Sequence, residues 1–130
     1  MDKKELVEEW LRYAGMDLSS AKTLLEIMHP APLEIICFHC QQAAEKYLKA
    51  IIIHFDGKPD KTHDLSTLLD YIDGYVQIED EFYRQVTTLT QFGVSVRYPN
   101  EIAIDEAMTK VAIASAEKVK QFAEIIVLER

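Results

Sequence analysis

Residues 38–50 read FHCQQAAEKYLKA, and this stretch decides the fold because it divides one helix into two unlike sides. One side carries His39, Gln42, Lys46 and Lys49, which lie three or four residues apart and therefore share a stripe. The other side is apolar and continues in both directions; it includes Cys37, Cys40, Ala43, Ala44, Tyr47, Leu48 and Ile51. A helix that packs on one side and offers polar groups on the other indicates a helical bundle with a binding site on it.

Helical periodicity extends over almost the whole chain of 130 residues. The spacing of apolar residues predicts five helices, over about residues 3–28, 32–55, 63–73, 79–92 and 106–128. We therefore expect an all-α protein, an up-and-down antiparallel helical bundle with four main helices and one shorter helix. The length suits one domain spanning residues 1–130.

Boundary residues support these helices. Pro32 suits the first position of the second helix, and Asp56-Gly57 supplies its C-terminal stop. Thr62 is expected to cap the third helix, with Asp64 in its first turn, and Asp105 is expected to cap the last helix, with Val111 on the buried side.

Charge is distributed unevenly in this acidic chain. The net charge is −8, yet residues 36–63 carry four basic and three acidic side chains and are net positive. Broad, non-specific DNA binding needs many cations facing phosphates and is therefore not expected. A local site for one phosphate or nucleotide is compatible with this distribution.

Cellular location follows from composition. No apolar run reaches the length needed to span a membrane, and the acidic N-terminal residues do not resemble a signal peptide. Cys37 and Cys40 both lie on the apolar side of their helix, so we expect reduced thiols in the core of a cytoplasmic protein. A Cys-x-x-Cys pair without further ligands does not make a zinc site, and we expect neither a metal nor a cofactor.

Three polar residues outside the second helix are also candidates. His63 stands at a helix start, where an N-terminal dipole favours a neutral imidazole; alternatively it only bonds a loop carbonyl. Arg97 and Tyr98 lie in the longest break in the helical pattern, where residues 94–98 look extended. A guanidinium offers a fork for phosphate and a phenol ring stacks on a base; alternatively Arg97 only pairs with a carboxylate.

The polar stripe on the second helix has a structural alternative too. Its members can be ordinary surface residues, with Glu45 and Lys49 forming a salt bridge four residues apart.

Taken together, Trp10 with Ala14 and Asp17-Leu18, then FHCQQAAEKYLKA, THDL at residues 62–65 and RYP at residues 97–99, in this order and spacing, resemble a HEPN domain, the nucleotide-binding domain shared by higher eukaryotes and prokaryotes. The resemblance covers nearly the whole chain. It implies a helical bundle that commonly homodimerises and is often encoded beside a small nucleotidyltransferase, with many such pairs acting as toxin and antitoxin. It also implies a polar cleft for nucleotide or RNA, formed here by His39, Gln42, Lys46, His63 and Arg97, with Tyr98 adjacent.

Many HEPN proteins are metal-independent ribonucleases with an Arg-x(4–6)-His motif. Arg97 matches the arginine, but Ile102, Ala103 and Ile104 occupy the positions at which histidine should follow. The first hypothesis is therefore a nucleotide- or RNA-binding module that works with a partner nucleotidyltransferase. The alternatives are an endoribonuclease toxin in which His63 replaces the missing histidine beside Arg97, and a non-catalytic dimeric assembly subunit.

Overall fold

The computed structural model describes residues 1–93 and 103–129, and every described element is helical. Three helices are long and two are short; they are α1 (Lys3–Ile27), α2 (Leu33–His54), α3 (Leu65–Asp73), α4 (Asp80–Thr87) and α5 (Glu106–Glu129). A 3₁₀ turn, η1 (Thr88–Phe92), continues α4. The prediction of an all-α antiparallel bundle of five helices is confirmed, with three long and two short helices where four main helices and one shorter helix were expected.

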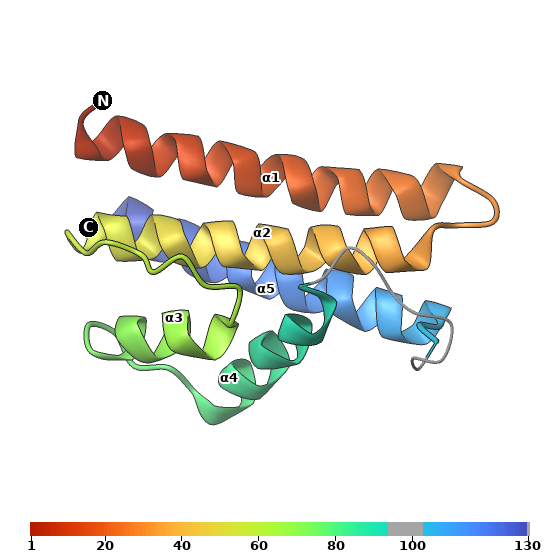
Figure 1. Cartoon of the computed structure of the whole chain (residues 1–130). Coiled ribbons are helices and arrows are strands. Elements are labelled where there is room, and N and C mark those ends of the chain that lie inside the picture. The colour runs from red at the N-terminus through yellow and green to blue at the C-terminus, as the bar shows by residue number, and fades with distance from the viewer. Residues whose placement is uncertain (94–102, 130) are drawn as a thin grey trace.

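Helix α2 is the centre of the bundle and packs against α1, α5, α3 and η1 (Figure 1). Helix α1 runs antiparallel to both α2 and α5 (Figure 1). Helices α2 and α5 begin at the same end of the bundle, where the thiol of Cys37 lies 3.5 Å from the hydroxyl of Thr109. Between α2 and α5, residues 55–64 run back along α2, α3 runs in the same direction as α2, and α4 leads back toward the end where α5 begins (Figure 1).

Most helix ends lie where the sequence predicts them. The Asp105 carboxylate accepts a hydrogen bond of 2.7 Å from the backbone N–H of Met108, which confirms the expected cap. The expected cap at Thr62 is wrong: Asp64 is the N-cap of α3, and its carboxylate accepts from the N–H of Ser66. Thr62 instead accepts from the N–H of Asp64. A carboxylate reaches the free N–H groups of the first turn as well as a hydroxyl does and also complements the dipole.

Two residues, Asp56 and Gly57, end α2, and each does so for a different reason. Asp56 takes the left-handed backbone conformation, with φ of 67°. Gly57 is required by close packing, because a Cβ atom there would lie 2.1 Å from the hydroxyl of Tyr71 and 2.9 Å from Cγ2 of Ile52.

The core is built mainly from α2, whose residues are buried on most sides. Helix α5 meets it through small residues such as Ala112, Ala116 and Ala123. The expectation that Val111 is buried is wrong, since 62% of it is exposed. Contact through Ala112 and Ala116 centres the buried face of α5 to one side of Val111. Among the described helices, none is long and apolar enough to cross a membrane.

Candidate functional site

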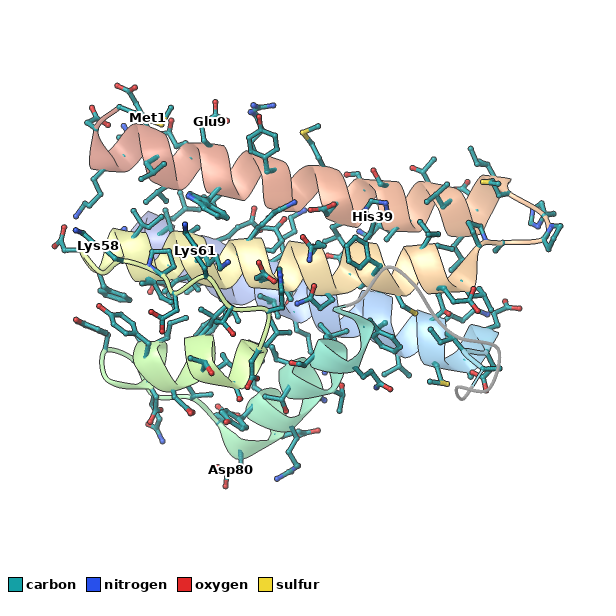
Figure 2. All side chains as sticks on the ribbon, in the orientation of Figure 1. Met1, Glu9, His39, Lys58, Lys61 and Asp80 are labelled. Carbon is teal, nitrogen blue, oxygen red and sulfur yellow. The ribbon has the colours of Figure 1, made fainter. Side chains whose placement is uncertain are left out.

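Asp17 on α1 joins two predicted site residues on α2. Its Oδ1 atom lies 2.9 Å from Nδ1 of His39, and its Oδ2 atom accepts from the ammonium of Lys46. His39 and Lys46 lie seven residues apart, about two helical turns, so their side chains leave the same face of α2. Figure 2 shows His39 in the seam between α1 and α2. We call these three residues the Asp17 cluster.

Glu45 forms a second cluster of the same kind. Its Oε1 atom lies 2.8 Å from Nδ1 of His63, and its Oε2 atom accepts a hydrogen bond of 2.9 Å from Nζ of Lys49. Gln41 completes it by donating from Nε2 to Oε1 of Glu45 and to the backbone carbonyl of His63. We call these four residues the Glu45 cluster; in both clusters one carboxylate divides its two oxygens between a histidine and a lysine.

Local sequence explains how the Glu45 cluster forms. Gln41, Glu45 and Lys49 follow one another at intervals of four residues, so they stand in a row on α2. After α2, residues 55–64 run back along that helix and bring His63 beside Gln41 (Figure 1). Gln42 adds a hydrogen bond of 2.8 Å from its Nε2 to Oε1 of Gln41.

The Glu45 carboxylate is buried, with only 6% of its side chain exposed. Burial, the largest single influence, raises the pKa of Glu45, but hydrogen bonds from His63, Lys49 and Gln41 together lower it below its ordinary value. Bonds to the charged form therefore outweigh desolvation. The group remains a carboxylate at neutral pH, which is the form that holds both Lys49 and His63.

Both histidines are held through Nδ1. Because an ionised carboxylate only accepts hydrogen bonds, Nδ1 carries the proton, and in a neutral ring Nε2 is then the basic atom. Among residues 1–93 and 103–129, neither His39 nor His63 has a hydrogen bond at Nε2. The His63 side chain is 69% exposed, so its Nε2 is open to a ligand or to proton exchange.

Two hollows lie beside the Asp17 cluster on the seam of α1 and α2. One has a volume of about 470 Å³ and includes Trp10, Tyr13 and Lys46 in its lining. The other has a volume of about 370 Å³ and is lined by three hydroxyl side chains, Leu24 and His39. The cluster therefore presents its ammonium to a hollow with two aromatic residues and its imidazole to a hollow lined mainly by hydroxyl-bearing residues.

The structure divides the predicted polar stripe between two sites. His39 and Lys46 belong to the Asp17 cluster, whereas Lys49 pairs with Glu45. The structural alternative anticipates this pair but places it on the surface, and the structure buries it. Gln42 reaches the Glu45 cluster through Gln41. The remaining two predicted site residues, Arg97 and Tyr98, and the extended segment expected around them lie outside the described residues.

Sequence reasoning missed three groups that organise the clusters, namely two accepting carboxylates and the amide of Gln41, which donates to Glu45. Asp17, Gln41 and Glu45 were not among the predicted site residues. The four-residue spacing from Gln41 through Glu45 to Lys49 was a usable signal for one cluster. For Asp17 the signal was weaker: a carboxylate directly before Leu18, on the side of α1 that packs against α2.

Cys37 and Cys40 lie in the core as predicted, and neither forms a disulfide. Burial, with a smaller contribution from Cys37, raises the pKa of Cys40 to about 12. Within the described part of the chain, no group of three or more histidine, cysteine or acidic side chains could hold a metal ion.

The family of this chain is shown by a comparison with protein-family models. A HEPN domain model matches residues 7–126. The crystal structure of TT1696 from Thermus thermophilus has a TM-score of 0.79 and 23% identity, covering 92% of this chain and 97% of that chain. ST0689, an archaeal HEPN homologue, has a TM-score of 0.71 and 22% identity, covering 93% and 97%. No curated protein matches the chain. At these identities the two structures are similar in fold, and the family rests on the domain match.

Proposed function

The chain belongs to the HEPN family, and on that basis we propose that it is a nucleotide- or RNA-binding module that acts with a partner nucleotidyltransferase. The observation that carries this proposal is the hollow between α1 and α2 that combines Trp10, Tyr13 and Lys46. Aromatic rings stack on nucleobases, and an ammonium group binds phosphate oxygens. A hollow with both features suits a ligand with both a base and a phosphate.

The Asp17 cluster supports this role by orienting its lysine. The ammonium of Lys46 has three donors, of which Asp17 takes one. Two donors remain for a phosphate, on a side chain that is already held in place. The same carboxylate also holds the imidazole of His39, which lines the neighbouring hollow.

Binding is measured directly by fluorescence, because Trp10 is the only tryptophan in the chain. We expect ATP or a short single-stranded RNA to quench or shift the emission of Trp10. Lys46→Ala removes a charged hydrogen-bond donor and should weaken binding at least about tenfold. Lys110→Ala, which removes a lysine of the exposed surface of α5, is the matched control and should bind like wild type.

An unchanged Trp10 spectrum with both ligands at millimolar concentration, at low salt, contradicts the binding proposal. If Lys46→Ala and Lys110→Ala weaken binding equally, the proposed position of the site is contradicted, because the loss of affinity then follows from the change in net charge alone.

The partner is tested separately. We propose that a nucleotidyltransferase encoded nearby and this chain form a toxin–antitoxin-like pair, with this chain as a homodimer. Expression of one member alone should then inhibit growth, and co-expression should restore it. Normal growth under all conditions, with no complex on size-exclusion chromatography, argues against the pair.

A specific observation favours a second candidate, a metal-independent endoribonuclease. Glu45 holds Nδ1 of the exposed His63, an arrangement in which Nε2 can accept a proton. In this reaction Nε2 takes the proton of a ribose 2′-hydroxyl, the 2′-oxygen attacks the phosphorus, and the bond from phosphorus to the 5′-oxygen breaks. The 5′-oxygen takes a proton from water, and the imidazolium returns its proton to solvent. The products are a 2′,3′-cyclic phosphate and a 5′-hydroxyl, and Arg97 is the candidate for stabilising the charge on the phosphorane.

The ribonuclease candidate predicts cleavage in the presence of a chelator, with a 2′,3′-cyclic phosphate end. His63→Ala and Arg97→Ala should each abolish cleavage, while Lys110→Ala retains it. RNA that stays intact after long incubation with excess protein rules this candidate out and leaves the binding proposal standing.

A further inference from the structure

A second basic hollow lies where α1 faces α2 and α5, and neither the Asp17 cluster nor the Glu45 cluster contributes to it. Its volume is about 290 Å³. Three of its lining residues, Arg12, Lys22 and Lys120, are basic. Such a concentration is unusual in a chain with 14 basic and 22 acidic residues. Small-molecule pockets begin at about this size, so the hollow suits a small ligand.

The charges around the hollow are only partly compensated. Arg12 pairs with Glu9 at 2.8 Å and Lys22 pairs with Glu117. Among the described residues Lys120 has no ion pair, although the charge of Glu124, four residues further along α5, acts in this region and, after burial, raises the pKa of Tyr47. A bound anion would give Lys120 a counterion and would add a second partner for the two paired cations, each of which has further donors.

Tyr47 gives the hollow a polar floor. The residue is only 2% exposed and its hydroxyl has no hydrogen bond among the described residues, but its oxygen is not one of the fully buried unpaired atoms. The hydroxyl is therefore open to the hollow that Tyr47 lines, where a ligand can accept a hydrogen bond from it.

Gly15 supplies a third observation, independent of charge. It lies within α1, where glycine is unfavourable relative to alanine. Packing does not require it: a Cβ atom at this position would lie 3.6 Å from the Tyr47 hydroxyl, an ordinary contact. Its absent side chain leaves open the space in front of that hydroxyl.

From these three observations we propose that the hollow bounded by Gly15, Tyr47 and Lys120 is a binding site for a small phosphate-class anion. Lys120, Lys22 and Arg12 neutralise the anion at the rim, and the Tyr47 hydroxyl donates to one of its oxygens. The backbone at Gly15 allows the anion to approach α1 closely.

Isothermal titration with inorganic pyrophosphate tests the site. Wild type should bind, and Lys120→Ala should weaken binding about tenfold or more, since it removes a charged donor. Lys110→Ala, also on α5, should bind like wild type. Gly15→Ala places a methyl group in the hollow and should weaken binding severalfold while the melting temperature stays the same or rises.

Amide NMR spectra report where on the protein the anion binds, which a change in net charge alone cannot reproduce. The chain has only four glycines, so their signals are readily assigned. Pyrophosphate should shift the Gly15 signal and leave that of Gly74, at the end of α3, in place. Absence of binding heat at millimolar pyrophosphate overturns the proposal, as does undiminished binding by both Lys120→Ala and Gly15→Ala.

Discussion

Replacement of Glu45 by glutamine tests whether the buried carboxylate organises the bundle. Glu45 and Lys49 have side chains that are 6% and 10% exposed, and removing one partner of such a pair leaves a buried charge. The usual cost is about 3–5 kcal/mol. Lys49 keeps part of its stabilisation from Trp10, whose ring centre lies 5.9 Å from Nζ. We therefore expect Glu45→Gln to lower the free energy of unfolding by about 3 kcal/mol.

The chain contains a matched control for this change. Glu106 and Lys110 form a pair with the same residue types and the same four-residue spacing, but their side chains are 67% and 66% exposed. Glu106→Gln should cost about 0.5 kcal/mol or less. Urea unfolding followed by circular dichroism, at one protein concentration and neutral pH, measures both. Equal losses of stability for Glu45→Gln and Glu106→Gln refute the reasoning, because burial would then make no difference.

Three further outcomes follow from the described contacts. The loss of stability caused by Glu45→Gln should be smaller in acid. The pKa of Glu45 is held below its ordinary value in the folded protein, so its stabilisation is present above that ordinary value and disappears as the pH falls through the lowered pKa. Urea unfolding of wild type and Glu45→Gln at neutral and at acidic pH measures the difference. An aromatic disulfide reagent should label neither cysteine in the native protein and both after denaturation, since Cys40 is buried with a pKa of about 12. Gly57→Ala should destabilise by about 1–3 kcal/mol in the same urea assay, because its methyl group would lie 2.9 Å from the buried Ile52.

The fold was largely predictable because its signals are local. Apolar spacing identified every long helix, and Asp105 was recognised as a cap from its position alone. The predictions that were wrong concern positions where two neighbouring residues both suit the same role. Thr62 and Asp64 both suit a cap, and the sequence alone does not decide between them, whereas in the structure Asp64 takes the role. Similarly, periodicity placed Val111 inside, whereas contact through neighbouring alanines leaves it outside.

The candidate site was less predictable because its organising groups come from separate elements. The sequence identified the histidines and lysines as unusual on a packed helix. It did not indicate that Asp17, 22 residues before His39, bonds to it. Nor could it show that residues 55–64 bring His63 back to the middle of α2, since no local pattern specifies that path.

Structural and chemical roles can be separated within the Glu45 cluster because its histidine and lysine differ in burial. Glu45→Gln disturbs the buried pair with Lys49 and so changes stability and any activity together. His63→Ala removes a side chain that is 69% exposed and leaves the pair of Glu45 and Lys49 in place, so its effect on stability should be small. A loss of RNA cleavage or ligand binding in His63→Ala, at near wild-type stability, therefore reports on the imidazole itself. If His63→Ala instead lowers the free energy of unfolding as much as Glu45→Gln does, the histidine stabilises the bundle. A loss of activity in His63→Ala then gives no evidence that its exposed nitrogen has a chemical role.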